Sequence, residues 1–253
     1  MKTGKIDFQD THAFNSFFLD YIQQKESLKK FYSRFPSLAN FKDQINEKSA
    51  FATEKRQRLA DELIKQYGDL RISEEVKTNL TALRDSKTFT VTTGHQLNIF
   101  TGPLYFIYKI VTVINACKEL KAAYPQCHFV PVYWMASEDH DYDEIKYFRL
   151  YGKKYVWNTQ QQGAVGRFHT RELRDLLNEV PGEISLFREA YTKSKTLSQA
   201  VLHYVNALFG HEGLIVVDAD NHELKKSLIP VIHDDLMHHH AKEKVDETTH
   251  ELQ

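Results

Sequence analysis

The stretch Thr88-Phe-Thr-Val-Thr-Thr-Gly-His-Gln-Leu-Asn-Ile-Phe-Thr-Gly-Pro-Leu-Tyr-Phe-Ile-Tyr-Lys109 decides the fold class. Its first residues alternate threonine with aromatic and β-branched residues, which predicts a short buried strand. A polar loop begins at Gly94. Thr101 or Gly102 lies near the expected N-cap of a helix, with Pro103 at its first position. A strand that passes through such a loop into a helix indicates an open α/β sheet, and ligands bind at that edge of such sheets.

Two further apolar runs predict strands that also end in polar residues. The run 128–135 is apolar almost throughout, which fits a parallel strand covered on both faces, although proline at 131 favours a sheet edge. The run 213–220 is similar. Parallel strands joined by right-handed crossovers end at one edge of the sheet. We therefore expect one site that gathers Thr93, Gly94, His95, Gln96, Thr101, Gly102, Ser137, Glu138, Asp139, His140, Asp141, Asp218 and Asp220.

These patterns predict an α/β protein with an open parallel sheet, a helical N-terminal lead-in and an inserted hairpin and helix segment. Helical spacing of apolar residues predicts helices over 12–34, 47–67, 73–84, 104–121, 170–180 and 194–210, and a β-hairpin over 146–158. Pro230 is expected to kink or break a further helix. The predicted regions are 1–86 (helical N-terminal region), 87–144 (first half of the core), 145–195 (insertion), 196–230 (continuation of the core) and 231–253 (start of a truncated helical region).

Bulk composition excludes several classes of protein. The 253 residues are 42% hydrophobic and 26% charged, which is typical of a globular protein with a sizeable core. A net charge of −1 predicts no nucleic-acid partner and no attraction to anionic membranes. No apolar run reaches the roughly 20 residues of a membrane span. Two cysteines, Cys117 and Cys127, are too few for a disulfide framework, so we expect free thiols and a cytoplasmic protein.

His95 is the first candidate for chemistry. An imidazole at this edge is suited to donate a hydrogen bond to a phosphate or carboxylate and to stabilise developing negative charge; alternatively it only caps the loop. Asp218 and Asp220 share one side if the strand is still extended, and they would accept hydrogen bonds from hydroxyl groups. Alternatively, Asp220 caps the next helix in an Asp220-x-x-Glu223 capping box.

The acidic run Glu138–Asp141 leaves three interpretations open. It is a metal site, since carboxylates and imidazole suit Mg²⁺, Mn²⁺ or Zn²⁺. It holds a general base beside a group that binds an amine or hydroxyl. Or it is a solvated loop that caps the following segment. His238-His239-His240 lies on a charged helical stretch, where consecutive side chains fan around the axis, so we predict no shared metal there.

The runs 93–109, 131–141 and 213–220 resemble the signature of the cysteine-adding enzymes of bacillithiol biosynthesis, the BshC family. Three long matches in the right order are far more specific than one short motif. The resemblance spans essentially the whole chain but about the first half of a family member. It implies a Rossmann-type core with inserted connecting segments, distantly similar to class I aminoacyl-tRNA synthetases. Gly94-His95 then falls at their first histidine-containing nucleotide motif, whose second histidine is not evident here.

The resemblance also implies an activity: cysteine is joined to the amine of glucosaminyl malate, which gives bacillithiol. The missing half would complete the core and form a helical coiled coil, so we expect the complete protein to be a homodimer and this part need not be active alone. Activation by ATP is chemically reasonable because a carboxylate is a poor electrophile, and no tightly bound metal is expected.

We interpret the chain as the N-terminal part of a ligase that forms a carbon–nitrogen amide bond. His95 and the helix start at 101–104 would stabilise anionic charge, Asp139 with Glu138 or His140 would hold or deprotonate the amine, and Asp218 or Asp220 would contact hydroxyls. One rival is a metal-dependent hydrolase centred on Glu138–Asp141. A second rival is a non-catalytic helical assembly module, which the helix-rich ends of the chain favour.

Overall fold

The computed structural model describes residues 4–252, which form two compact units. One unit comprises residues 48–231 and contains both β-sheets. The other unit comprises the segments before residue 48 and after residue 231, and its regular elements are helical. The finer division into five regions stays a prediction.

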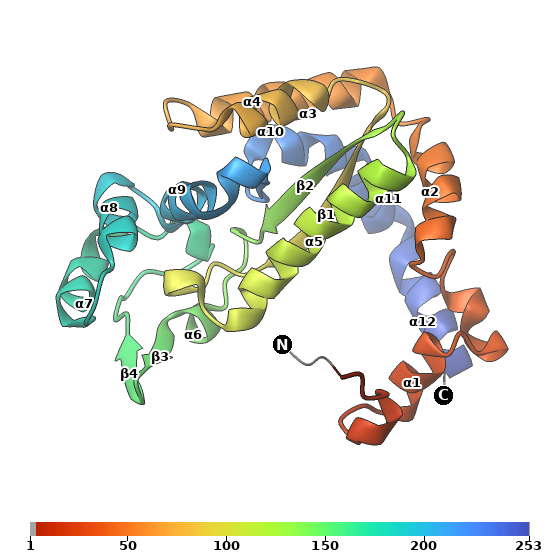
Figure 1. Ribbon diagram of the computed structural model, residues 1–253, viewed down its shortest axis with the longest axis horizontal. Coiled ribbons are helices and arrows are strands. Elements are labelled where there is room, and N and C mark those ends of the chain that lie inside the picture. Colours follow the sequence, from red (N-terminus) through yellow and green to blue (C-terminus); the bar gives the residue numbers. More distant parts are fainter. Residues whose placement is uncertain (1–3, 253) are drawn as a thin grey trace. The chain divides into compact units, whose positions relative to one another are not determined.

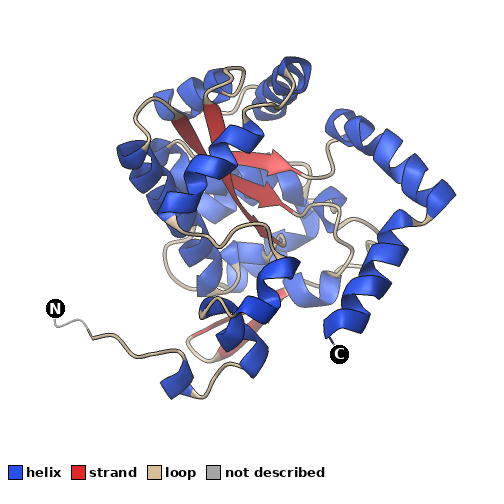
Figure 2. Ribbon diagram, turned by 90° about the vertical axis from the view of Figure 1, so that its right-hand side faces the viewer, coloured by secondary structure: helices blue, strands red, loops and turns tan. Residues whose placement is uncertain are grey.

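A parallel three-stranded sheet lies at the centre of the larger unit (Figures 1 and 2). Its strands are β1 (Thr88–His95), β2 (His128–Met135) and β5 (Ile215–Asp218), in the spatial order β1-β2-β5. All three strands were predicted from the sequence, and the α/β fold with a Rossmann-like parallel sheet is confirmed. β1 runs through His95, one residue beyond the glycine at which the sequence suggested an interruption.

Two helices make the crossovers of this sheet. α5 (Leu104–Ala123) connects β1 to β2 and packs against both, and α9 (Leu197–Phe209) precedes β5 and packs against it. The apolar residues of α5 that recur three or four positions apart are the ones it buries, as expected of a helix that covers a sheet. These residues are Phe106, Ile110, Val113, Ile114, Cys117 and Leu120.

Side chains of α3 (Thr53–Tyr67) occupy the outer edge of β5. The Gln66 amide donates to the carbonyl of Val216 (2.8 Å) and accepts from the backbone N–H of Asp218 (2.9 Å). The Tyr67 hydroxyl accepts from the N–H of Val216 (2.9 Å). An open strand edge exposes unpaired backbone groups that invite another strand. α3 satisfies these groups and thereby closes this side of the sheet.

Pro131 lies in the central strand, although proline prefers a sheet edge. It pairs with Val91 of β1, whereas β5 pairs only with the part of β2 from Val132 onward. The amino-terminal half of β2 therefore has a single neighbour, and at Pro131 it is locally an edge strand. This explains why a residue without an N–H group is tolerated there.

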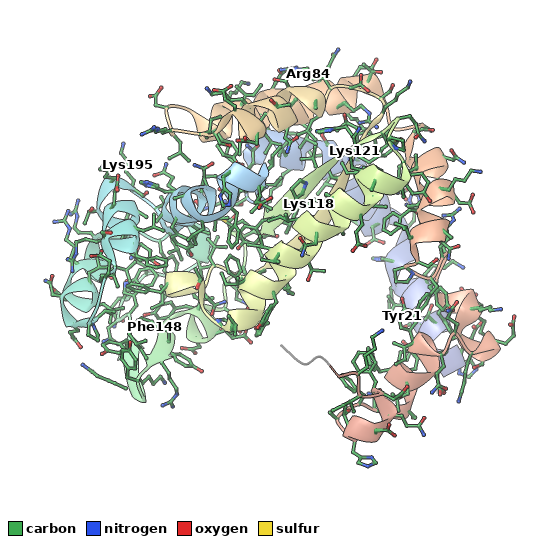
Figure 3. All side chains as sticks on the ribbon, in the orientation of Figure 1. Tyr21, Arg84, Lys118, Lys121, Phe148 and Lys195 are labelled. Carbon is green, nitrogen blue, oxygen red and sulfur yellow. The ribbon has the colours of Figure 1, made fainter. Side chains whose placement is uncertain are left out.

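The insertion after β2 begins with a hairpin and continues with helices. The predicted hairpin is confirmed as the antiparallel pair β3 (Tyr147–Leu150) and β4 (Lys153–Val156). The ring of Phe148, labelled in Figure 3, stacks on Tyr155 at 5.2 Å and contacts Phe100 at 4.7 Å. The elements around the hairpin are α6 (Tyr142–Ile145), η5 (Val165–Arg167), η6 (Thr170–Glu172), α7 (Leu173–Glu179) and α8 (Ser185–Lys193).

The N-terminal helices are shorter than predicted. The helix expected over 12–34 is broken at Gln24, which has a left-handed backbone (φ 54°), and the helix expected from 47 begins only at Thr53 because Ala52 is extended. The helix predicted over 73–84 is present, and Ser73 caps it by accepting from the N–H of Val76. The elements are η1 (Gln9–Thr11), α1 (Ser16–Ile22), η2 (Glu26–Phe31), η3 (Leu38–Asn40), α2 (Phe41–Lys48) and α4 (Glu74–Ala82).

The segments that flank β5 complete the fold. The predicted break at Pro230 is present: a new helix begins at Ile229, and Pro230 lies in its first turn, where proline is tolerated. Within residues 4–252, no helix combines the length and the apolar character that crossing a bilayer requires. The remaining elements are η4 (Ile99–Thr101), η7 (Gly210–Glu212), α10 (His222–Lys225), η8 (Lys226–Leu228), α11 (Ile229–His238) and α12 (His240–Leu252).

Candidate functional site

The carboxyl ends of the three parallel strands place the predicted polar residues along one edge of the sheet. His95 is in register with Met135 of β2, and Met135 is in register with Asp218 of β5. A single row across the sheet thus ends at an imidazole on one side and a carboxylate on the other. We call this row and the loops that follow it the strand-end site.

Ser137 joins the loop after β2 to the end of β5. Its hydroxyl, fully buried, donates to Oδ1 of Asp218 and accepts from the backbone N–H of Asp220 (3.0 Å). The same Asp218 oxygen accepts from that N–H (2.9 Å). Among the described residues, the second oxygen of the Asp218 carboxylate has no hydrogen-bond partner. Asp218 is therefore held in a fixed orientation with one oxygen available to a ligand.

Asp220 is held by two cations that the sequence did not point to. Arg167 binds it with two hydrogen bonds (2.5 and 3.0 Å), and Lys225 adds a third (2.6 Å). Burial alone would raise the pKa of Asp220, but these bonds outweigh burial and leave the pKa below its ordinary value. The alternative that Asp220 caps the next helix is wrong, because Asn221 caps α10 by accepting from the N–H of Leu224.

Gly166 brings Arg167 to the site. The N–H of Gly166 donates to the carbonyl of Ser137 (2.9 Å), and a Cβ at position 166 would lie 2.5 Å from the Cβ of Ser137. Only glycine permits this approach. No local signal in the sequence marks the contact, since Arg167 and Asp220 are 53 positions apart.

His95 lies in an apolar setting and is neutral at pH 7. Its side chain is 9% exposed and contacts the rings of Tyr105 (5.2 Å) and Phe106 (5.4 Å). Burial, followed by the positive charge of Lys109, lowers the pKa of His95 to about 4. The Nδ2 amide nitrogen of Asn98 lies 3.3 Å from Nε2 of His95. An amide nitrogen only donates, so Nε2 accepts and the proton of the neutral ring is assigned to Nδ1.

The start of α5 adds positive character near His95. Pro103 is the N-cap residue rather than the first helical residue, and no side chain caps the helix. The N–H of Phe106 donates to the carbonyl of Pro103 (3.0 Å), and the two N–H groups before it stay available to an anion. Lys109 donates to the carbonyl of Gly94 (2.9 Å), which holds its ammonium group against the end of β1.

The backbone conformation and the close packing at position 102 both require glycine. Its φ is +62°, and a Cβ there would lie 2.4 Å from the Cβ of Asn98. Gly102 thus leaves room for the residue that orients His95. Thr101 has a left-handed backbone (φ 73°), and Thr93 is a half-buried residue of β1.

The acidic run after β2 is divided among different roles. Asp139 accepts from the backbone N–H of Asp141 (3.0 Å) and from the Gln96 amide (2.9 Å), and these bonds hold its pKa below the ordinary value. Asp141 caps α6 by accepting from the N–H of Glu144. Glu138 and His140 are exposed.

In the described part of the chain, no three potential metal-ligand atoms of the acidic run converge. Three potential ligand atoms converge there only at Asp234, His238 and His240, far along the sequence from the run 138–141. Within the run, Asp139 instead contacts the loop after β1, because it accepts the hydrogen bond from Gln96.

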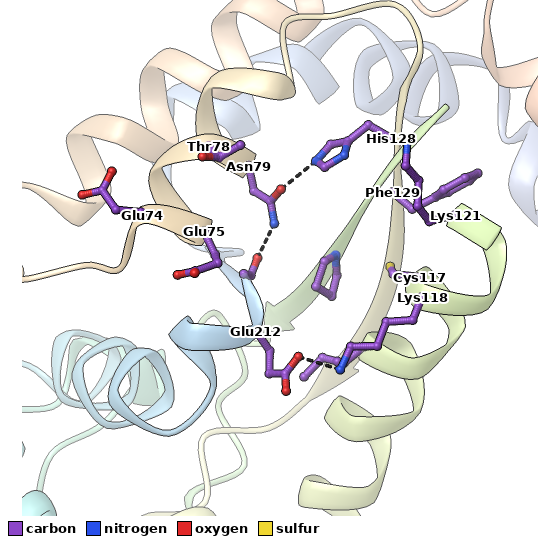
Figure 4. A pocket seen from close by; sticks show the side chains of 13 residues that line it. Glu74, Glu75, Thr78, Asn79, Cys117, Lys118, Lys121, His128, Phe129 and Glu212 are labelled. Carbon is purple, nitrogen blue, oxygen red and sulfur yellow. Dashed lines mark hydrogen bonds and ion pairs between the residues drawn. The ribbon is translucent and has the colours of Figure 1, made fainter. Parts of the chain in front are cut away.

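A cavity of about 570 Å³ lies at the other end of the sheet (Figure 4). It is lined by His128, the first residue of β2, and by Gly213, which precedes β5. His128 is bonded to Asn79 (2.7 Å), and Lys118 is paired with Glu212 (2.7 Å). The residues predicted for chemistry lie at the opposite edge and do not line this cavity.

Comparison with known proteins agrees with the fold. The family model described as bacillithiol biosynthesis BshC, N-terminal Rossmann-like domain, matches residues 1–253. Proteins named cysteine ligase BshC from Flavobacterium psychrophilum and Flavobacterium johnsoniae are 45% and 43% identical over 100% of the chain and 50% of their own length. One from Bacillus cereus is 28% identical over 83% of the chain and 42% of its length.

The chain spans about half the length of these relatives, and the family model that it matches describes an N-terminal Rossmann-like domain. The family model matches every residue of the chain, and two relatives are more than 40% identical to it. The chain therefore belongs to the BshC family of bacillithiol biosynthesis and corresponds to its N-terminal Rossmann-like domain.

Proposed function

We propose that the complete protein joins the carboxylate of cysteine to the amine of glucosaminyl malate, and that this chain supplies the strand-end site for that reaction. The names of the relatives support a ligase. The observation that supports the proposal is the row from His95 through Met135 to Asp218, which brings an imidazole and a carboxylate to one sheet edge.

The anion-binding side is formed by His95, Lys109 and the start of α5. A neutral imidazole with its proton on Nδ1 donates a hydrogen bond without needing to be charged, so its function does not depend on pH near neutrality. Preorganised donors of this kind stabilise negative charge that develops on a reacting carboxylate. ATP, whose phosphates fit uncapped helix N–H groups and a lysine, would supply activation of that carboxylate when bound.

The amine is held by Asp139 in this proposal. Hydrogen bonds from Gln96 and from the backbone keep Asp139 ionised, and a carboxylate with a lowered pKa is a weak base. Asp139 is therefore better suited to bind and orient the ammonium form than to remove its proton. Exposed Glu138 and His140 lie beside it and are accessible to a substrate.

Asp218, rather than Asp220, contacts hydroxyl groups of the sugar. One Asp218 oxygen is engaged by Ser137 and the other has no partner among residues 4–252, whereas both Asp220 oxygens are bound by Arg167 or Lys225. Asp220 then has a positioning role, because its backbone N–H fixes the Asp218 carboxylate.

Incubation of the complete protein with glucosaminyl malate, cysteine and ATP, followed by mass spectrometry, tests the activity. His95→Ala should lower the turnover by about 100-fold or more, and Asp139→Asn should mainly raise KM for the amine substrate. His211→Ala is the matched control, because His211 is an exposed histidine of η7 at the opposite end of the sheet. The absence of an amide product with the wild-type protein would refute the proposal, and wild-type turnover by His95→Ala would refute the role of His95.

The two rival functions are less well supported. A metal-dependent hydrolase centred on Glu138–Asp141 requires three convergent ligands, which the described residues of this run do not provide. A purely structural helical module predicts no saturable ligand binding. A thermal-shift titration with cysteine, amino-sugars and ATP distinguishes it from the ligase, because ligands that bind only the folded state raise the melting temperature.

A further inference from the structure

The junction between α11 and α12 places two histidines side by side in the smaller unit. α11 ends at His238, α12 begins at His240, and His239 between them has a left-handed backbone (φ 57°). The rings of His238 and His240 stack with centroids 5.4 Å apart and planes at 20°. In an uninterrupted helix these two side chains would point in nearly opposite directions. The prediction that the three consecutive histidines diverge is thus wrong for this pair.

Asp234 adds a carboxylate to the two imidazoles. Its Oδ1 lies 3.0 Å from Nδ1 of His238, and its Oδ2 lies 3.9 Å from Nε2 of His240. One ligand atom from each of the three residues lies within 4.8 Å of the other two. Asp234 and His238 are one helical turn apart on α11, so the helix itself presents them on one face.

The surrounding contacts hold this arrangement in place. The carboxylate of Asp235 accepts from the N–H of Ala241 (2.7 Å), which caps the first turn of α12 across the kink. The N–H of His239 donates to the carbonyl of Asp235 (2.7 Å). Glu243 lies 4.0 Å from Nδ1 of His240, so the ring has one carboxylate at each nitrogen. Metal-bound histidines usually have such a carboxylate at the nitrogen that does not bind the metal.

We propose that Asp234, His238 and His240 form a binding site for a divalent transition-metal ion of the Zn²⁺ type. Two imidazole nitrogens and one carboxylate oxygen are ligands that Zn²⁺ accepts, and three protein ligands leave a fourth position open. All three side chains are about 60% exposed, so the ion reaches the site directly from solvent. The bound ion links the end of α11 to the start of α12 and fixes the kink at His239.

A left-handed backbone at a residue other than glycine supports this assignment. Such a conformation is uncommon for residues other than glycine, and strained backbone positions concentrate at functional sites. The kink also turns His238 and His240 toward one another. The strain at His239 and the convergence of the ligands are therefore parts of one arrangement.

Isothermal titration of Zn²⁺ alone into the chain tests the site. We expect one ion per chain, and a loss of affinity of about tenfold or more for His238→Ala, His240→Ala and Asp234→Asn separately. The matched control is His239→Gly, which removes the middle imidazole of the tract but favours the left-handed backbone. Because it relieves strain in the metal-binding conformation, His239→Gly should bind Zn²⁺ at least as tightly as the wild-type chain.

Two results would overturn the proposal. If His239→Gly weakens binding as much as His238→Ala, the metal binds the histidine tract as a flexible chain and not the kinked site. If Asp234→Asn binds normally, the carboxylate is not a ligand. A nuclear magnetic resonance titration gives an independent readout, since Zn²⁺ should shift the ring protons of His238 and His240 and leave those of His239 nearly unchanged. Equal shifts for all three rings would contradict the assignment.

Discussion

Lowering the pH should destabilise the protein through His95, because its apolar surroundings disfavour the charged imidazolium. The pKa of His95 falls from 6.5 to about 4, first because of burial and then because of the charge of Lys109. When the folded-state pKa lies below the unfolded value, the unfolded chain binds more protons between the two. The stability that this group contributes is therefore complete above pH 6.5 and is lost as the pH falls toward 4.

The size of the effect follows from the same shift. One pKa unit corresponds to about 1.36 kcal/mol, so the full difference amounts to about 3 kcal/mol when both states have titrated. At pH 5 the unfolded imidazole is largely protonated and the folded one is not. The linkage relation then gives a loss of about 2 kcal/mol in the free energy of unfolding between pH 7.5 and pH 5.

Urea unfolding at pH 7.5 and pH 5 measures this loss in the wild-type chain and in His95→Gln. Glutamine keeps an acceptor for the Asn98 amide but does not ionise, so other titrating groups cancel in the comparison. The wild-type chain should lose about 2 kcal/mol more than the variant, and His211→Gln should behave like the wild type because His211 is exposed. Equal pH dependence of wild type and His95→Gln, or a His95 ring that titrates near pH 6.5, would refute the reasoning.

Three further predictions concern packing and reactivity. Gly166→Ala should lower the free energy of unfolding by about 1–3 kcal/mol, because the new methyl group overlaps Ser137; an unchanged urea midpoint would contradict the close approach. Arg167→Ala should raise the pKa of Asp220 and lower the free energy of unfolding at pH 7, a loss that disappears when acid protonates Asp220; carbon-detected carboxylate titrations measure the pKa change. Cys117 is buried and its pKa is raised to about 12, so iodoacetamide at pH 8 should leave it unmodified in the folded chain, whereas rapid labelling would show that it is accessible.

Patterns along the chain were sufficient for the elements that bury a continuous apolar face. The strands β1, β2 and β5 and the helices α5 and α9 were predicted near their observed bounds, because strand and helix periodicity are local properties. The gathering of His95 and Asp218 at one edge also followed from the sequence, since parallel strands with right-handed crossovers end on the same side. The resemblance to the BshC family was recognised in the runs that end at this edge, and the family model matches the whole of residues 1–253.

Contacts between distant segments were decided only by the tertiary structure. The pairing of Arg167 with Asp220 depends on the close approach of Gly166 to Ser137, and neither partner is marked as such along the chain. α8 was missed for a different reason: its apolar residues Leu186, Phe187, Ala190 and Tyr191 do recur at helical spacing, but this local pattern was overlooked after the Pro-Gly stop. The kink at His239 depends on one backbone angle that hydrophobic periodicity does not encode.

The sequence by itself determined which residues have the chemistry and which strand or loop carries them, because residue type and periodicity are local. Only the tertiary structure decided the protonation states and hydrogen-bond partners of these residues. The neutral form of His95, the ionised form of Asp139 and the occupied oxygens of Asp220 all depend on burial and on partners from other segments. Desolvation and hydrogen bonding act through space, and a linear pattern does not contain the distances that set them.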